Sequence, residues 1–138
     1  MAETAGRWPY RHSIRVRYQE VDMQRVVFNA HYLAWCDEVM AGWMTHAFGW
    51  KGSDDRIDWM LVKLVLEWQG SATFGDTMDI YAGIARWGTT SFDVEFRGVV
   101  ADRPVFSATI TYVCVAPGAT TKMPVPDEVR RVLGPVPA

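Results

Sequence analysis

A carboxylate at the start of a long helix is the strongest chemical feature of this sequence. Asp22 falls in a polar turn, and the apolar pattern of a helix follows it. The first N–H groups of a helix have no partner inside it, so they can polarise a carbonyl or stabilise an oxyanion. A carboxylate beside them can attack the carbonyl carbon or activate a water. This pairing suits acyl transfer, although aspartate is also common in turns for purely local reasons.

The helix that would position this turn is predicted from Tyr32 to Phe48. Its apolar residues recur at intervals of three and four and give a wide apolar face: Tyr32, Trp35, Cys36, Val39, Met40, Trp43, Met44 and Ala47. Gly49 and Gly52, within a polar loop, are expected to end it. It is the only long helix that the pattern predicts, so the remaining elements must cover it.

Alternating apolar and polar residues predict five strands, over residues 12–18, 57–69, 78–86, 92–97 and 105–115. The apolar face of the second is expected to hold Met60, Val62, Leu64, Leu66 and Trp68, and that of the fifth Phe106, Ala108, Ile110, Tyr112 and Cys114. The turns between the last four strands are short, which predicts that consecutive strands are antiparallel neighbours in a meander.

These elements predict an α+β fold, with an antiparallel sheet of about five strands around one long central helix. We expect a single domain over residues 1–138. Residues 1–11 are predicted to be a loose arm, and residues 124–138 a proline-rich tail with a short helix from Pro126 to Leu133. Unpaired sheet edges also predict self-association.

Composition narrows the classes of partner and compartment. The formal net charge of −2 gives no support for a nucleic acid or an anionic membrane as partner. No run of apolar residues is long enough to span a membrane or to resemble a secretory signal. Cys36 and Cys114 fall in apolar periodic segments and are expected to be buried free thiols. These features fit a cytoplasmic protein.

The turn and helix also resemble a known signature. Residues 18–35, YQEVDMQRVVFNAHYLAW, resemble the 4-hydroxybenzoyl-CoA thioesterase-like branch of the hotdog-fold acyl-CoA thioesterases, whose pattern reads roughly R-Y-x-E/D-x-D-x-x-G-x-V-x-x-x-x-Y. The resemblance continues, in the same order, through ATFGD at 72–76, GTTS at 88–91 and KMPVP at 122–126. It therefore covers nearly the whole chain and implies the hotdog fold.

The resemblance implies roles for particular residues. Asp22 falls on the catalytic aspartate of the family, and the backbone N–H at Asn29 falls on the group that polarises the thioester carbonyl; the Asn29 side chain could instead cap the helix. The substrate-binding candidates are Arg25, Val27, Phe28, His31 and Tyr32. Arg25 stands where the family usually has glycine, so it could distort the turn, line the thioester end of the pocket or face solvent.

The predicted function is hydrolysis of an acyl-CoA thioester, with Asp22 as nucleophile or general base. Coenzyme A arrives as part of the substrate, and we expect no other cofactor and no metal site. The expected assembly is a homodimer or homotetramer. Two alternatives stay open: a thioesterase for acyl-carrier-protein thioesters, and a non-catalytic acyl-CoA-binding protein. Asp37 and Glu38 on the helix are the next carboxylates to consider, although the His-Gly-Gly element of a second hotdog lineage is absent.

Overall fold

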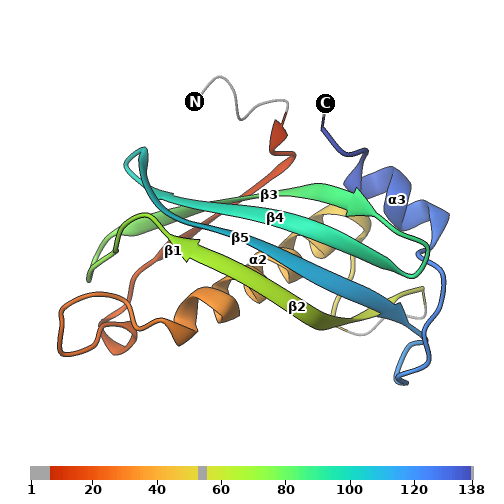
Figure 1. Ribbon diagram of the computed structural model, residues 1–138, viewed down its shortest axis with the longest axis horizontal. Helices are drawn as coiled ribbons and strands as arrows, with labels where there is room; N and C mark the ends of the chain where they lie inside the picture. The colour runs from red at the N-terminus through yellow and green to blue at the C-terminus, as the bar shows by residue number, and fades with distance from the viewer. Residues whose placement is uncertain (1–6, 53–55, 138) are drawn as a thin grey trace.

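The computed structural model describes residues 7–52 and 56–137, and it contains one sheet and one long helix. The elements in chain order are β1 (Tyr10–Arg15), the 3₁₀ turn η1 (Tyr18–Glu20), α2 (Ala30–Phe48), β2 (Asp58–Trp68), β3 (Thr77–Trp87), β4 (Ser91–Val100), β5 (Arg103–Val115) and α3 (Asp127–Leu133). All neighbouring strands are antiparallel, and the sheet covers one side of α2 (Figure 1). The predicted α+β class is confirmed.

The helix packs its apolar stripe against the sheet. Seven of the eight predicted apolar positions are buried, and Ala47 is partly buried. On the sheet, the predicted inner face of β5 is buried throughout, from Phe106 to Cys114 at every second residue. Each large apolar side chain that is fully buried stabilises the fold by roughly 1.5–3 kcal/mol. The helix ends at Gly49, which has a φ of 76° and donates its N–H to the carbonyl of Thr45.

The predicted meander is correct for β3, β4 and β5, which are neighbours in that order, and wrong for β2. The sheet order is β1-β3-β4-β5-β2, so β2 pairs with β5 and lies at one edge of the sheet. The chain then crosses the end of the sheet through residues 69–76 to reach β3. β2 and β3 are three strand spacings apart, or about 14 Å. The eight residues of this connection are long enough to cover that distance, whereas a tight hairpin turn is too short.

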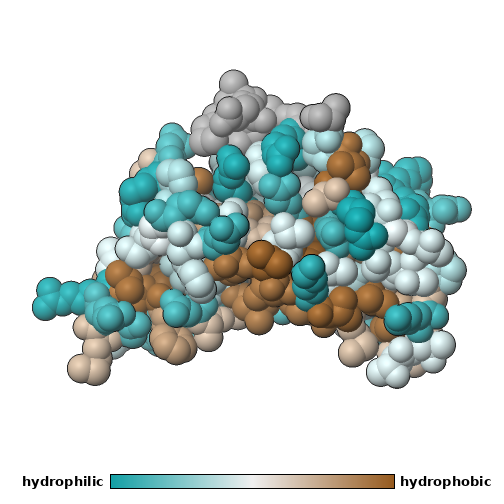
Figure 2. Space-filling view, viewed as in Figure 1, coloured by the Kyte–Doolittle hydropathy of each residue, from teal (hydrophilic) through white to brown (hydrophobic). Residues whose placement is uncertain are grey.

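The predicted inner face of β2 is only partly correct. A register shift lies between Leu61 and Lys63, and it breaks the alternation in the middle of the strand. Leu64 and Leu66 pack against the core as expected. Met60, Val62 and Trp68 were predicted on the same inner face and are instead exposed. Leu61 and Val65 are exposed as well, so β2 carries five exposed apolar side chains. Figure 2 shows a hydrophobic band along the edge of the molecule where Figure 1 places β2.

The start of the chain also departs from the prediction. Residues 1–6 of the predicted loose arm lie outside the described residues, but Trp8 is buried and β1 already begins at Tyr10. The Tyr10 ring stacks on Trp43 of α2 with 6.2 Å between the ring centroids. The strand ends at Arg15 because the next residues turn into η1, and so the predicted strand over residues 12–18 is displaced toward the N-terminus.

Both thiols are buried, as predicted. Cys36 on α2 and Cys114 on β5 are free and have no exposed surface. Burial raises the pKa of Cys114 to about 11, and burial together with the nearby Asp37 raises the pKa of Cys36. No helix of the described residues combines the length and the hydropathy that crossing a membrane requires.

Gly98 on β4 lies directly against the Phe106 ring of β5 and leaves no room for a side chain. A Cβ atom built on Gly98 would overlap the Phe106 ring of β5 and lie 3.0 Å from Sδ of Met78. Gly98→Ala is therefore expected to lower the free energy of unfolding by about 1–3 kcal/mol, as overpacking of a core usually does. Urea denaturation followed by Trp fluorescence measures this change.

The control for this prediction removes the atoms that clash. Phe106→Leu shortens the ring side chain, so the Gly98→Ala/Phe106→Leu double variant should lose less stability than the two single losses added together. A Gly98→Ala protein as stable as the parent would contradict the close packing.

Candidate active site

Asp22 lies in a small closed loop between η1 and α2. Val21 and Val27 form an isolated antiparallel bridge across the loop. The N–H of Asp22 donates to the carbonyl of Val26 at 3.0 Å, and the N–H of Phe28 donates to the carbonyl of Glu20 at 2.9 Å. These backbone contacts pair Val21 with Val27 and Glu20 with Phe28, and therefore fix the loop against the start of the helix.

The Asp22 carboxylate has one bonded oxygen and one free oxygen. Oδ1 accepts a hydrogen bond from the N–H of Gln24 at 2.8 Å, which is the local turn bond expected of an aspartate. Within the described part of the chain, no group donates to Oδ2. The side chain is partly buried. Asp22 therefore serves the turn and still leaves an acceptor oxygen available for chemistry.

Arg25 adopts the backbone conformation that favours glycine. Its φ is 66°, in the left-handed region that is uncommon for residues with a side chain. Its N–H donates to the carbonyl of Asp22 at 2.9 Å, and its own carbonyl accepts a hydrogen bond from the hydroxyl of Thr73 at 2.7 Å. The turn is thus not distorted: Thr73 holds Arg25 in the conformation that a glycine would adopt freely.

The loop that crosses the sheet from β2 to β3 is hydrogen-bonded to the Asp22 loop. The N–H of Val27 donates to the carbonyl of Ala72 at 2.9 Å. At the other end of the crossing loop, the N–H of Gly75 donates to the carbonyl of Val16 at 3.1 Å, and the N–H of Val16 donates to the carbonyl of Asp76 at 2.8 Å. The segment ATFGD therefore joins β1 to the Asp22 loop, so the sheet crossing that breaks the meander also builds the site.

A groove opens beside Asp22, between its loop and the crossing loop. We call it the Asp22 groove; its volume is about 720 Å³ and it is lined by Tyr18, Gln19, Val21, Asp22, Met23, Arg25, Thr73 and Phe74. Three of its apolar side chains are well exposed: Tyr18, Met23 and Phe74. Tyr18 and Phe74 meet edge to face at 6.3 Å between ring centroids. Asp22 and Arg25, predicted as site residues, share this groove.

Asn29 stands at the N-terminal end of α2. Its backbone is already helical, with a φ of −51° and a ψ of −38°, and its side chain makes no capping hydrogen bond. The predicted alternative of a side-chain cap is therefore wrong. No acceptor among residues 7–52 and 56–137 receives the Asn29 N–H, so within that part of the chain this donor stays available to a ligand.

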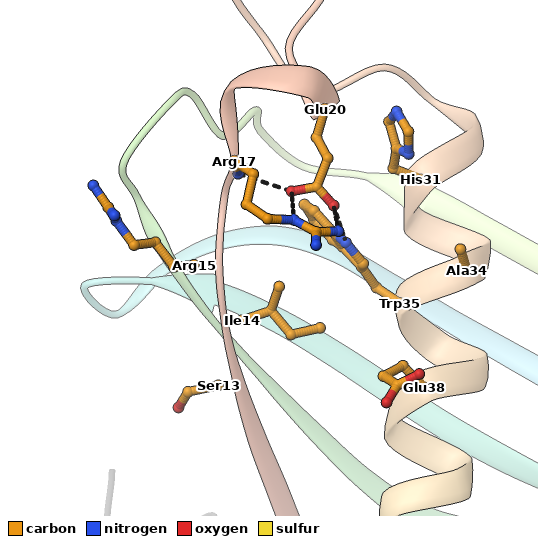
Figure 3. A pocket seen from close by; sticks show the side chains of 9 residues that line it. All are labelled: Ser13, Ile14, Arg15, Arg17, Glu20, His31, Ala34, Trp35 and Glu38. Atoms are coloured by element: carbon orange, nitrogen blue, oxygen red, sulfur yellow. Dashed lines mark hydrogen bonds and ion pairs between the residues drawn. The ribbon is translucent and has the colours of Figure 1, made fainter.

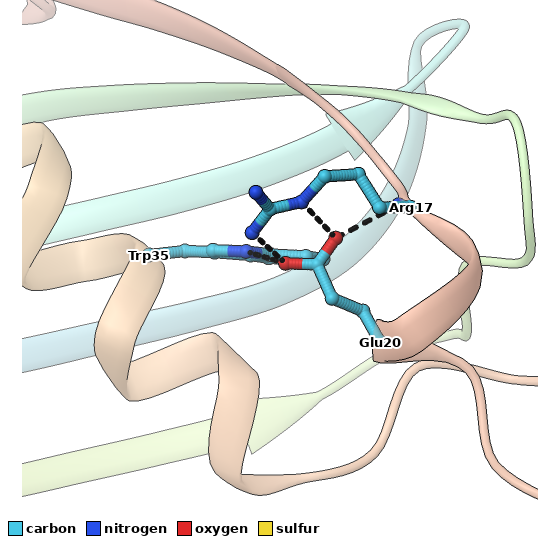
Figure 4. Close-up of polar contacts among 3 residues, drawn as sticks. All are labelled: Arg17, Glu20 and Trp35. Atoms are coloured by element: carbon cyan, nitrogen blue, oxygen red, sulfur yellow. Dashed lines mark hydrogen bonds and ion pairs between the residues drawn. The ribbon is translucent and has the colours of Figure 1, made fainter.

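Glu20 is the one charged side chain that the described residues bury, with 2% of its surface exposed. Its Oε1 accepts the N–H of Arg17 at 2.8 Å, and its Oε2 accepts Nη2 of Arg17 at 3.0 Å and Nε1 of Trp35 at 2.9 Å (Figure 4). Burial alone raises the pKa of this carboxyl, but the hydrogen bonds from Arg17 and Trp35 and the Arg17 charge outweigh it and lower the pKa to about 2.

Glu20 and Asp22 face different grooves although one residue separates them. Glu20 lines a second groove of about 560 Å³ between β1 and α2, which we call the Glu20 groove. Figure 3 shows His31 and Glu38 on its helix side and Arg15 and Arg17 on its strand side. The structure therefore places His31 in the Glu20 groove and not beside Asp22, and Glu38 lies with it.

The other predicted site residues lie in the core or at the surface. Val27 and Tyr32 are buried, and the Tyr32 ring meets Phe106 of β5 edge to face. Phe28 is half exposed and its ring meets that of His31. Asp37 lies further along α2, where the hydroxyl of Tyr112 donates to its Oδ1 at 3.3 Å. Neither Asp37 nor Glu38 lines the Asp22 groove.

Comparison with known proteins decides the family. The sequence model of the thioesterase-like superfamily matches residues 16–133, which span both loops of the site and the whole sheet after β1. The chain belongs to the thioesterase-like superfamily. No curated protein sequence matches the chain.

Solved structures show the same hotdog fold at low sequence identity. A gentisyl-coenzyme A thioesterase is 23% identical with a TM-score of 0.81, and the match covers 91% of this chain and 100% of that one. A 1,4-dihydroxy-2-naphthoyl-CoA thioesterase from Synechocystis is 18% identical with a TM-score of 0.78, over 90% of this chain and 94% of that one. A hypothetical protein from Aquifex aeolicus is 19% identical with a TM-score of 0.84, over 91% and 100%. The predicted fold and family are confirmed.

Two residues of this thioesterase-like site were not predicted. Thr73 and Glu20 both fall inside segments that carry the resemblance, ATFGD and the E/D-x-D pattern, but neither was assigned a role. The spacing of Trp35 and Glu20 along the chain gives no sign that their side chains meet. Only the packing of η1 against α2 brings the indole N–H to the carboxylate.

The low pKa of Glu20 predicts that the fold loses stability in acid. The carboxyl has an ordinary pKa of 4.5, which applies in the unfolded chain, and about 2 in the folded chain. The stabilisation is therefore complete above pH 4.5 and is lost as the pH falls toward 2, by about 1.4 kcal/mol for each pKa unit that separates the two states. Urea denaturation at pH 6, 4 and 3 measures it.

The control for this prediction is Glu20→Gln, which cannot ionise. Its unfolding free energy should fall less steeply between pH 6 and 3 than that of the parent protein, because the remaining carboxyls contribute equally to both. Identical slopes for the two proteins would contradict the assignment to Glu20.

Proposed function

We propose that this protein hydrolyses acyl-CoA thioesters to a carboxylic acid and free coenzyme A. The observation that carries the proposal is the Asp22 carboxylate: among the described residues its Oδ2 accepts no hydrogen bond, and its loop is tied to the start of α2, where the Asn29 N–H has no acceptor. The 1,4-dihydroxy-2-naphthoyl-CoA and gentisyl-coenzyme A thioesterases that share the fold support coenzyme A as the thiol carrier. Coenzyme A is part of the substrate, and the proposal needs no other cofactor.

Asp22 supplies the carboxylate in either of two balanced routes. As a nucleophile, its Oδ2 bonds to the carbonyl carbon, the carbon–sulfur bond breaks with release of the thiolate, and water then hydrolyses the resulting anhydride. As a general base, it takes a proton from a water whose oxygen attacks the same carbon; the tetrahedral intermediate then collapses, the carbon–sulfur bond breaks, and the proton held by Asp22 passes to the leaving thiolate. Both routes place negative charge on the carbonyl oxygen as the tetrahedral intermediate forms.

The helix start is the proposed partner for that charge. The Asn29 N–H finds no acceptor in the part of the chain that the structure describes, and it lies at the positive end of the α2 dipole. A backbone donor of this kind stabilises an oxyanion without rearrangement, because the helix already fixes its direction. In this proposal the carbonyl oxygen points to Asn29 and the carbonyl carbon faces Asp22.

The Asp22 groove is the proposed site for the thioester end of the substrate. Tyr18, Met23 and Phe74 offer exposed apolar surface, and Arg25 lines the same groove with a cation. Val27 and Tyr32 are buried and would hold the loop and the start of the helix in place. Phe28 and His31 would contact parts of the substrate that extend outside the Asp22 groove. Hydrolysis rates over a panel of acyl-CoAs identify the acyl group that the groove accepts.

Self-association through β2 is part of the proposal. The strand lies at an edge of the sheet and exposes five apolar side chains, a surface that monomeric proteins rarely leave open. A second copy of the chain would cover it, and a homodimer or a homotetramer would result.

The central prediction concerns Asp22→Asn. Asparagine keeps the size of the side chain and can accept the Gln24 hydrogen bond, but it can neither attack a carbonyl as a carboxylate nor take a proton from water. We expect kcat to fall by about 10²–10⁴-fold with little change in KM. The measurement is steady-state hydrolysis over a panel of aryl, short-chain and long-chain acyl-CoAs, with thiol detection.

The matched control is Asp102→Asn in the exposed turn between β4 and β5. Asp102 has a φ of 66°, a conformation that asparagine also tolerates, so its kcat should equal that of the parent protein. An Asp22→Asn variant that hydrolyses its best substrate at the parental rate would rule out this mechanism and turn attention to Asp37 and Glu38. A parent that binds acyl-CoA without hydrolysing it would support the binding-protein alternative.

Light scattering at micromolar concentration tests the assembly. The expected mass is at least twice the 15.6 kDa of one chain. Val62→Lys places a charge on β2, where 57% of the parental side chain is exposed in the single chain, and should shift the mass toward the monomer. Val136→Lys, at an apolar residue of the C-terminal tail that is 45% exposed, should leave the mass unchanged. A parental mass of 15.6 kDa would refute the assembly.

A further inference from the structure

Glu20 contacts both parts of the proposed catalytic site, the Asp22 loop and the start of α2, through its backbone carbonyl and its side chain. Its carbonyl accepts the Phe28 N–H at 2.9 Å, directly before Asn29. Its Oε2 accepts the Trp35 indole N–H at 2.9 Å, from the second turn of α2. Asp22 follows Glu20 by two residues in the same loop. One residue therefore joins η1, the Asp22 loop and the helix that carries the Asn29 donor.

The Glu20 carboxylate is unsuited to catalysis by itself. Both oxygens already accept hydrogen bonds, its surface is almost wholly buried, and it lines the groove that does not contain Asp22. A buried carboxylate is costly unless its charge is paired and its oxygens are bonded, and here Arg17 and Trp35 supply both. The arrangement is rigid because each donor fixes a different direction.

We propose that Glu20 is a positioning residue that sets the location of the Asp22 carboxylate relative to the Asn29 N–H. This inference rests on the proposed function of Asp22. The carboxylate of Glu20 clamps η1 to α2, so the distance between the attacking oxygen and the oxyanion donor depends on that clamp. Misplacement of reacting groups by about 1 Å can cost about 10²-fold in rate.

The Arg17 side of the clamp explains why the charge persists. Arg17 is mostly exposed, with 65% of its side chain accessible, yet it contacts Glu20 through its backbone N–H, Nε and Nη2. Burial raises the pKa of Glu20, but these contacts, the Arg17 charge and the Trp35 hydrogen bond together lower it to about 2, so the carboxylate is ionised at neutral pH. A neutral amide offers only one acceptor oxygen and cannot hold all three groups.

The test is Glu20→Gln, which preserves shape and removes the charge and one acceptor. We expect kcat to fall by about 10–100-fold while KM changes less than about threefold, because the Asp22 groove, which holds the thioester end of the substrate, is separate from the clamp. The assay is run below the unfolding transition of every variant, with near-UV circular dichroism to confirm the folded fraction. A residue that only stabilises the fold would lower the unfolding temperature and leave kcat of the folded protein unchanged.

Amide hydrogen exchange supplies a readout that does not depend on activity. Glu20→Gln should speed exchange at the Asp22 and Phe28 amides, whose bonds close the loop, and leave the β4–β5 amides protected. Arg17→Met serves as a second variant in case Glu20→Gln does not fold, because Arg17 lies at the surface. It should lower kcat by about threefold or more and loosen the same amides.

The matched control is Asp93→Asn. Asp93 is also a carboxylate held by an arginine, Arg86, with Nε to Oδ2 at 3.0 Å, but it lies near the start of β4 and lines neither groove. Its removal should leave kcat and the loop amides unchanged. Equal losses of kcat in Asp93→Asn and Glu20→Gln would overturn the inference, since both would then report general destabilisation.

The outcomes separate this inference from the function on which it rests. Loss of hydrolysis in Asp22→Asn with parental kcat in folded Glu20→Gln and Arg17→Met overturns the positioning role alone. Parental hydrolysis in Asp22→Asn overturns the proposed mechanism and the positioning role with it. Loss in Asp22→Asn, Glu20→Gln and Arg17→Met, with Asp93→Asn unaffected and the Asp22 and Phe28 amides loosened, supports both.

Discussion

The burial of one long helix against one face of a sheet is the constraint on which this structure depends. Among the described residues, no other helix is long enough to cover the apolar stripe of α2, from Tyr32 to Met44, so the stripe packs against the sheet. The sheet meets it with the alternate residues of β3, β4 and β5, which are buried along most of their length. Because both partners are rigid, the N-terminus of the helix is held in a fixed position relative to the sheet.

The site is built at that fixed end from two loops that are distant in sequence. The loop of residues 21–27 leads into α2, and the loop of residues 69–76 crosses the end of the sheet between β2 and β3. Hydrogen bonds from Val27 to Ala72 and from Thr73 to Arg25 join them. The crossing exists because β2 and β3 are not neighbours in the sheet. Topology and site are therefore consequences of the same strand order.

The interior of the described chain contains one charged side chain, that of Glu20, which differs from Asp22 in how its carboxylate is bonded. Glu20 alone is buried, and it is paired and bonded at both oxygens, as the cost of burying a carboxylate requires. Asp22 has the opposite character, with a partly buried side chain and a free oxygen at the edge of a groove. Within one short segment, one carboxylate is held for structure and the other is left available for chemistry.

The sequence by itself determined the long helix, the five strands, the α+β class and the position of Asp22 before the helix. These features follow from periodicity and turn chemistry, which are local, and the order of the short motifs identified the thioesterase family. Only the tertiary structure decided the strand order, the bulge that exposes β2, the start of β1 at Tyr10 and the meeting of Glu20 with Trp35. It also separated His31 from Asp22 and gave Arg25 its left-handed backbone. These outcomes depend on contacts between residues far apart in the chain, and local patterns carry no information about which distant groups will meet.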